Sequence, residues 1–272
     1  MTTTIKRAYA DTPYGQLHYR HAGRGEPILL LHQSATSSAC FEGLIPHLAA
    51  THRVIAVDTP GFGMSDRPPR QWSVADYSQS FVDLLDVLQI ARTSIYAHHT
   101  GATWACELAA GHPSRVAALI VDGPPFWTEP TAELMAKRIF PIVLKDDGSH
   151  LAAVWEDITG RLKEAFPQPY SPKILETINA EVLWKLIAGT RYHEAYVALY
   201  HYDILSRLPL IEAPTLVMSG ANDSLRRTLE PVAERIRRKR TYVGPGGSYL
   251  KSYEEPQALA RVILDFIKDP QA

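Results

Sequence analysis

His99 lies where a reactive side chain would be presented to a substrate. It follows the apolar, β-rich run from Thr93 to Ala97 and precedes Thr100 and Gly101, where a helical pattern begins. Positive charge is disfavoured at the N-terminus of a helix, so an imidazole at this position tends to stay neutral. A neutral imidazole removes protons from water or hydroxyl groups, and we therefore predict that His99 is a general base.

Hydroxyl and carboxylate side chains lie in other turns that follow apolar runs. Ser34 follows the run from Ile28 to His32, whereas Asp223 and Ser248 lie in glycine-containing turns near the C-terminus. A hydroxyl is a poor nucleophile until a base within about 3 Å removes its proton. These residue types predict acid–base or nucleophilic chemistry, provided that the fold brings the turns together.

The elements that must position these residues form an α/β pattern. Short apolar runs alternate with longer stretches of helical periodicity, which is typical of a mostly parallel sheet covered by helices on both faces. Ligands bind such sheets at the carboxyl ends of the strands. We predict eight strands, at residues 5–10, 16–21, 28–32, 54–58, 93–97, 117–122, 215–219 and 241–243.

Two helices follow from local signals. Ser73 is placed to cap a helix that has Asp76 in its first turn, and the apolar residues that follow recur on one face. A second helix runs from about Gly101 to Gly111, where Gly111 and Pro113 end it.

The alternation of strands and helices breaks between residues 125 and 207. This stretch is rich in aromatic residues in helix-like segments, and it predicts a helical cap inserted into a core of residues 1–124 and 208–272. A plain second helical subdomain has the same packing pattern. Trp127, His193 and Tyr196 are candidate substrate contacts from the cap, although aromatic residues at helical spacing more often serve packing.

Four stretches spread over nearly the whole chain carry a family resemblance. They are Leu29 to Ser34, Asp58 to Asp66, Tyr96 to Ala102, and Gly244 to Ser248 with the following Glu254 to Pro256. In order and spacing the chain resembles the α/β-hydrolase superfamily, in the capped branch that includes epoxide hydrolases, haloalkane dehalogenases, carbon–carbon bond hydrolases and small esterases. The resemblance implies an eight-stranded, mostly parallel α/β-hydrolase sheet with an inserted helical cap.

The resemblance also assigns roles, and the chain departs from the family's pattern at two of them. The family's strand-to-helix elbow reads Gly-x-nucleophile-x-Gly, and His99 stands at the nucleophile position, where serine, cysteine or aspartate is usual. The family's catalytic histidine is expected where Ser248 stands. Serine and histidine therefore look exchanged, so that His99 would activate Ser248, or else Ser34.

Supporting roles follow from the same resemblance. The family's acid is expected near Asp223, and Asp122 is the alternative acid position of some capped relatives. The backbone N–H groups of Ser34 and Thr100 are the expected oxyanion donors. His98 is interpreted as a packed support residue. The turn after the third strand also places His32 and Gln33 as candidate substrate contacts.

The resulting functional prediction is a cofactor-free hydrolase that acts on an ester-like or carbon–carbon bond of a small, partly apolar molecule. Two alternatives stay open. One is a lyase of the retro-aldol or decarboxylating kind with His99 as its base. The other is a ligand-binding protein that has lost catalysis, although an exchange that keeps both a serine and a histidine favours retained activity.

Composition limits the partners. The 28 Lys and Arg residues nearly balance the 29 Asp and Glu residues, so no net field attracts nucleic acid or an anionic membrane. The expected partner is a small-molecule substrate. The scattered histidines and two unpaired cysteines predict neither a metal site nor a disulfide, and the first residues lack a signal-peptide core, so a cytoplasmic location is expected. A monomer and a homodimer are both compatible with the aromatic-rich cap.

Overall fold

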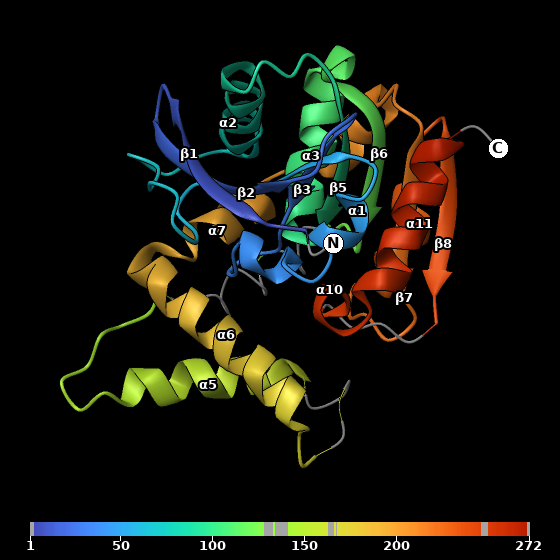
Figure 1. Ribbon diagram of the computed structural model, residues 1–272. Coiled ribbons are helices and arrows are strands. Elements are labelled where there is room, and N and C mark those ends of the chain that lie inside the picture. The colour runs from blue at the N-terminus through green and yellow to red at the C-terminus, as the bar shows by residue number, and fades with distance from the viewer. Residues whose placement is uncertain are drawn as a thin grey trace.

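The computed structural model describes residues 3–127, 133, 141–162, 166, 168–245 and 250–270. One eight-stranded sheet forms the centre, in the order β1-β2-β4-β3-β5-β6-β7-β8 (Figure 1). β1, β2 and β4 pair antiparallel, and the remaining neighbours pair parallel, which confirms the predicted fold class. The strands are β1 Lys6–Thr12, β2 Gly15–Ala22, β3 Pro27–Leu31, β4 Arg53–Val57, β5 Thr93–His98, β6 Val116–Asp122, β7 Thr215–Gly220 and β8 Lys239–Gly244.

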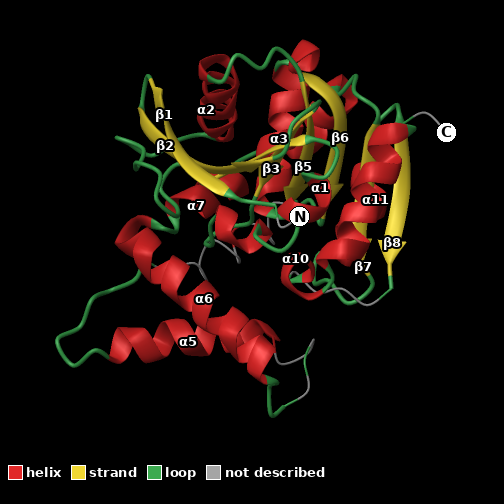
Figure 2. Cartoon of the chain, in the orientation of Figure 1, coloured by secondary structure: helices red, strands yellow, loops and turns green. Residues whose placement is uncertain are grey.

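Helices cover both faces of the sheet (Figure 2). α2 (Val74–Val87) and α3 (Thr100–Gly111) pack on one face, whereas α1 (Ile45–Leu48) and α11 (Pro256–Lys268) pack on the other. The inner strands β3 and β5 are almost wholly buried because they are covered on both sides. The shorter elements are η1 Ser38–Phe41, η2 Pro113–Arg115, η4 Leu208–Leu210, η5 Arg226–Thr228, α9 Leu229–Ala233 and α10 Lys251–Glu254.

The start of α2 shows the predicted cap. The Ser73 side chain accepts a hydrogen bond from the Asp76 backbone N–H, and the Asp76 carboxylate accepts one from the Ser73 backbone N–H. This reciprocal pair satisfies amides that have no partner within the helix, and it fixes where α2 begins.

The chain leaves the sheet after β6 and returns at β7. The excursion contains α5 (Ser149–Leu162), α6 (Pro172–Ala188), η3 (Gly189–Arg191), α7 (Glu194–Tyr200) and α8 (Ile204–Arg207). In Figure 1, α5 and α6 lie at the end of the molecule toward which the arrowhead of β8 points. Among the helices in the described ranges, none combines the length and apolar character needed to cross a membrane.

Candidate active site

The elbow between β5 and α3 holds His99 in an uncommon backbone conformation. His99 has φ 48° and ψ −118°, a region that non-glycine residues rarely adopt and that costs conformational energy. The turn is tight: a Cβ on Gly101 would lie 2.5 Å from the Leu31 carbonyl oxygen, so only glycine fits there. The backbone thus presents His99 at the end of the central strand, as the resemblance predicts.

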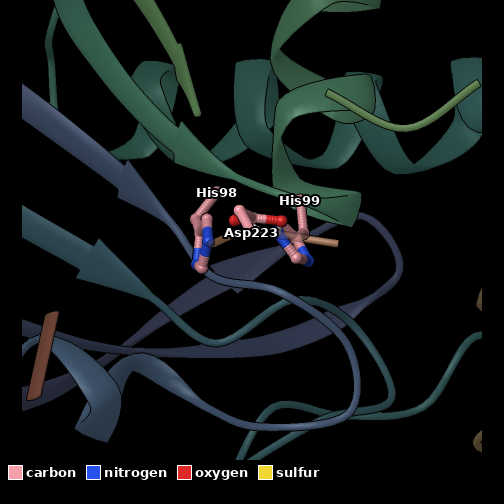
Figure 3. A group of neighbouring side chains, drawn as sticks. All are labelled: His98, His99 and Asp223. Atoms are coloured by element: carbon pink, nitrogen blue, oxygen red, sulfur yellow. Dashed lines mark hydrogen bonds and ion pairs between the residues drawn. The ribbon is translucent and has the colours of Figure 1, made fainter. Parts of the chain in front are cut away.

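His99 and Asp223 form a close pair. The His99 Nε2 lies 2.9 Å from Asp223 Oδ2 and 3.1 Å from Oδ1, and Figure 3 shows the carboxylate beside the ring. Asp223 lies just after β7, and its Oδ1 also accepts a hydrogen bond from the Leu225 N–H at 2.8 Å. The Asp223 side chain is fully buried, whereas that of His99 is 14% exposed. The structure therefore joins two residues that are 124 positions apart in the sequence.

Electrostatics keep the carboxylate ionised. Burial favours the neutral form of Asp223, but the charge and hydrogen bond of His99, the nearby His98 and the Leu225 N–H outweigh it and hold the pKa well below its usual range. Because an ionised carboxylate only accepts hydrogen bonds, Nε2 of His99 carries the hydrogen. In the neutral imidazole, Nδ1 is then the basic nitrogen.

The alternative acid, Asp122, has other partners. Its carboxylate accepts hydrogen bonds from the Tyr96 hydroxyl at 2.8 Å and from Lys251 Nζ at 2.6 Å, and all three side chains are buried. Asp122 is therefore neutralised within the core, and Asp223 is the carboxylate that contacts His99. No sequence pattern indicated Lys251, which lies on α10.

His98 is a packed support residue, as interpreted from the sequence. It is fully buried, and its Nδ1 lies 3.1 Å from Gln33 Oε1. Burial, together with the charges of His99 and Lys251, lowers the pKa of His98 well below its usual value, so its ring is neutral.

Two candidate substrate contacts lie buried beside His98. The Gln33 Oε1 faces His98, whereas the Gln33 Nε2 is buried without a hydrogen-bond partner among the described residues. His32 is also buried: its Nε2 accepts a hydrogen bond from the Thr59 N–H at 2.9 Å, and its Nδ1 donates one to the Gln33 carbonyl at 2.7 Å. Both nitrogens of His32 thus hold neighbouring backbone in place.

The predicted oxyanion donors need a correction at Ser34. Its backbone N–H donates to Thr100 Oγ1 at 2.6 Å instead of pointing at a substrate oxygen. Because an amide nitrogen only donates, the Thr100 hydroxyl must use its own hydrogen elsewhere, and it donates to Ser34 Oγ at 3.1 Å. The Ser34 hydroxyl hydrogen remains directed away from Thr100. The Thr100 N–H lies in the first turn of α3, where amides have no acceptor within their own helix.

The remaining predicted residues differ in where they lie. Ser248 lies outside the described residues. Tyr196, on α7, reaches the site, because its hydroxyl donates to the Ser34 carbonyl oxygen at 2.5 Å. The Trp127 ring packs edge-on against Tyr200, with ring centroids 4.7 Å apart, and the His193 ring lies 6.2 Å from that of Tyr192. Trp127 and His193 thus pack against aromatic rings, and Trp127 Nε1 and His193 Nδ1 are buried without hydrogen-bond partners among the described residues.

One set of side chains has a grouping suited to a metal ion. Within the part of the chain that the structure describes, a nitrogen of His98, a nitrogen of His99 and an oxygen of Asp223 lie within 4.8 Å of one another (Figure 3). A metal ion there would have to replace the hydrogen bond between His99 Nε2 and Asp223. His98 Nδ1, His99 Nε2 and the Asp223 oxygens already take part in hydrogen bonds, whereas His98 Nε2 is buried without a hydrogen-bond partner among the described residues.

Comparison with known proteins identifies the same fold as the structure. A sequence model described as alpha/beta hydrolase fold matches residues 26–247. The chain belongs to the α/β-hydrolase fold family. A hydrolase from Pseudomonas aeruginosa has a similar structure, with a TM-score of 0.78 and 25% identity, covering 96% of this chain and 98% of that one.

Two sequence relatives differ in how much of their own length, and of this chain, the match covers. An uncharacterized protein of Mycobacterium tuberculosis is 40% identical over 103 residues, so the match spans only 38% of this chain and 30% of that relative. A haloalkane dehalogenase of Mesorhizobium japonicum is 26% identical over 99% of this chain and 93% of its own length. Of the proteins compared here, the Pseudomonas aeruginosa protein is named a hydrolase and the Mesorhizobium japonicum protein a haloalkane dehalogenase.

Proposed function

We propose that this α/β-hydrolase is a cofactor-free enzyme that cleaves an ester-like or carbon–carbon bond beside a carbonyl group of a small, partly apolar molecule. His99 is its general base, and Asp223 orients and stabilises the imidazole. The observation that supports this most directly is the 2.9 Å contact between His99 Nε2 and the buried Asp223 carboxylate at the elbow.

The reaction follows from the state of these groups. Nδ1 of neutral His99 takes a proton from the attacking oxygen, which forms a bond to the carbonyl carbon. The imidazolium that results is stabilised by the ionised Asp223. It then returns the proton to the leaving oxygen or carbon as that bond breaks. If the attacking oxygen belongs to water, the reaction is complete and has consumed one water molecule. If it belongs to a serine, water must next attack the acyl-serine through the same proton transfers, which releases the acid and restores the serine.

The attacking oxygen belongs either to water or to a serine hydroxyl. Ser34 is a candidate because Thr100 donates to its oxygen and leaves the Ser34 hydrogen for another acceptor. Ser248 is the candidate that the exchanged elbow suggests. A fluorophosphonate probe followed by peptide mass spectrometry would locate a serine nucleophile, whereas an unlabelled but active enzyme would leave direct attack by water.

The decisive experiment measures hydrolysis of short aliphatic esters by His99→Gln and Asp223→Asn. We expect kcat/KM to fall at least about 100-fold in His99→Gln, because general base catalysis contributes about that much or more. In Asp223→Asn, kcat/KM should fall by a smaller factor, and the pH dependence of kcat/KM should shift. The control is His52→Gln, which changes a histidine directly before β4, at the amino end of that strand, whereas His99 follows the carboxyl end of β5.

Two results would count against this function. Full activity in His99→Gln would remove the proposed base. Products that carry no oxygen from heavy-oxygen water would indicate a lyase, since a retro-aldol or decarboxylating reaction consumes no water.

A further inference from the structure

The polar groups of Ser34 take part in a chain of hydrogen bonds. The Ser34 N–H donates to Thr100 Oγ1 at 2.6 Å, and the Thr100 hydroxyl donates to Ser34 Oγ at 3.1 Å. The Ser34 carbonyl oxygen accepts from the Tyr196 hydroxyl at 2.5 Å. Within the described ranges Ser34 has no further hydrogen-bond partner, so its hydroxyl hydrogen is left without an acceptor among them.

The direction of this chain follows from the chemistry of its groups. An amide nitrogen donates and does not accept, so Thr100 Oγ1 must accept from Ser34. Thr100 is only 5% exposed, so its own hydrogen needs an acceptor within the protein, and Ser34 Oγ is the acceptor in contact with it. The Ser34 hydroxyl then keeps its hydrogen for another acceptor. Because hydrogen bonds in a chain polarise one another, this hydroxyl is a stronger donor than that of an isolated serine.

Ser34 and His99 lie at the same edge of the sheet. β3 and β5 are adjacent and parallel, with Leu31 paired to Ala97, so the turn that carries Ser34 and the elbow that carries His99 follow neighbouring strand ends. Ser34 is half-buried, which leaves its hydroxyl accessible from one side. The Thr100 backbone N–H, in the first turn of α3, belongs to the residue that contacts Ser34 Oγ. One hydroxyl and one amide thus lie as donors next to the proposed base.

The hydrogen bonds of Ser34 suit a donor better than an attacking group. A hydroxyl that attacks must give its proton to a base in contact with it. Among the described residues the partners of Ser34 are Thr100 and Tyr196, and neither is a base. Burial raises the pKa of Tyr196, so its phenol stays protonated and donates. The bond from Thr100 also occupies a lone pair of the Ser34 oxygen, which makes this oxygen less nucleophilic.

We propose that the Ser34 hydroxyl, together with the Thr100 backbone N–H, stabilises the oxyanion of the tetrahedral intermediate. The inference deepens the proposed function and rests on it. As the attacking oxygen bonds to the carbonyl carbon, the electron pair of the C=O double bond moves to the carbonyl oxygen, which accepts both hydrogen bonds. The pair returns when the leaving bond breaks, and Ser34 keeps its proton throughout. The Thr100 side chain is a positioning group, since its hydroxyl acts on the oxyanion only through Ser34.

Ser34→Ala distinguishes an oxyanion donor from an attacking group. Removal of one oxyanion donor lowers kcat about 100- to 1000-fold, so kcat of Ser34→Ala toward short aliphatic esters should fall by that factor with KM nearly unchanged. The fluorophosphonate probe should not label Ser34 in the native enzyme. An unchanged kcat in Ser34→Ala, or a fluorophosphonate label on Ser34, would overturn the proposal.

Ser206→Ala is the matched control. It removes an exposed serine hydroxyl in α8 that donates to the Asp203 carbonyl oxygen at 3.0 Å. This change should leave kcat at the native value, so that the loss in Ser34→Ala is assigned to the position of the hydroxyl and not to the removal of a serine.

A double-mutant cycle tests the positioning role of Thr100. Thr100→Ser keeps the hydroxyl and should keep kcat close to the native value. Thr100→Val removes both hydrogen bonds between its side chain and Ser34, so kcat should fall about 10-fold, which is the usual size for one hydrogen bond. In the Ser34→Ala background, Thr100→Val should have little further effect, because the group through which it acts is gone. Effects on kcat that multiply in full would overturn the positioning role.

Binding of a phosphonate separates this inference from the hydrolase proposal, because it needs no turnover. The anion of monoethyl butylphosphonate is tetrahedral at phosphorus and resembles the intermediate. Its Kd, measured by calorimetry, should rise about 10- to 100-fold in Ser34→Ala, which is the usual range for a lost charge-assisted hydrogen bond. Ester hydrolysis together with equal phosphonate binding by the native enzyme and Ser34→Ala would overturn the oxyanion role while the hydrolase stands. Ser34-dependent phosphonate binding without hydrolysis of any ester or ketone would support the donor site and overturn the proposed hydrolase function.

Discussion

The pairing of His99 with Asp223 depends on a neighbouring residue that has no side chain. Gly123 follows β6 with φ +60°, and a Cβ there would lie 2.7 Å from His99 Cδ2 and 2.9 Å from His99 Nε2. The nearest Asp223 oxygen would be 3.4 Å away. Real Cβ atoms do not approach other atoms so closely, so Gly123 leaves the room in which the imidazole meets its carboxylate.

We therefore expect Gly123→Ala to displace the His99 ring and to lower kcat/KM toward esters by about 10- to 100-fold, since small misplacements of a catalytic group cost about that much. The control is Gly148→Ala. Gly148 has a similar φ of +72°, but a Cβ added there would meet nothing within 4 Å, so the two variants share only the backbone strain. Equal losses of kcat/KM in Gly123→Ala and Gly148→Ala would show that the loss does not come from the contact with His99.

At the scale of single residues, the sequence predicted which residue types form the candidate active site, but it did not predict the hydrogen-bond partner of every residue. His99 and Asp223 both follow predicted strands, and parallel strands bring their carboxyl ends together. Asp122 is the last residue of a neighbouring strand, β6, and it satisfied the same rule. What excludes it is Lys251, 129 positions later, and no local pattern connects the two. The partner of His32 could not be predicted either, because Thr59 lies on another turn.

At the scale of elements, Asp58 joins the turn after β4 to its surroundings. Its Oδ1 accepts a hydrogen bond from the Ser38 N–H at 2.6 Å, and its Oδ2 accepts from the Met64 N–H at 2.9 Å and lies 2.8 Å from His18 Nδ1. Burial alone would raise the pKa of Asp58, but these contacts outweigh burial and lower it to about 2. The ionised carboxylate thus fixes β2, η1 and the glycine-rich turn against one another.

Asp58→Asn should reduce the free energy of unfolding by about 2 kcal/mol at neutral pH, which is the size that the lowered pKa implies. The native pKa is depressed, so this stabilisation is present above about pH 4 and is lost as the pH falls toward 2. Urea unfolding of both proteins across that range measures the difference. A difference that stayed constant with pH would mean that the charge of Asp58 contributes nothing.

The strands themselves were well predicted because apolar runs that are buried on both faces have a strong pattern. The exception is β8, which begins at Lys239 instead of Thr241. It is an edge strand with exposed side chains, so Lys239 and Arg240 carry no apolar signal. The contact between Asp157 and Lys185 had no sequence signal either, because the two residues come together only when α5 packs on α6.

At the scale of the whole molecule, α6 is attached to the core through a buried acid. The Tyr253 hydroxyl, at α10, donates to Glu181 Oε1 at 3.0 Å. Glu181 is only 4% exposed, and burial raises the pKa of its carboxyl group. Burial therefore favours protonated Glu181, and the hydrogen bond from Tyr253 opposes burial without outweighing it.

We expect Glu181→Gln to stabilise the protein, because glutamine resembles the protonated acid and keeps the acceptor for Tyr253. The native pKa is raised, so the stability of the unmodified protein falls as pH rises above about 4.5, by up to about 1.4 kcal/mol per pH unit until the native pKa is passed. The difference in melting temperature between Glu181→Gln and the unmodified protein should therefore increase over the same pH range. Glu176→Gln, exposed on the same helix, is the control, and an advantage that is equal at all pH values would contradict the prediction.

The place where the chain leaves the sheet has a consequence for engineering. β6 and β7 are adjacent and parallel, so the sheet needs only one crossover between them, whatever its length. The helices from α5 to α8 can therefore be exchanged as a cassette between related proteins while the strand order stays intact. A chimera that keeps the elbow and accepts a foreign cassette would transfer substrate preference separately from the chemistry of the base.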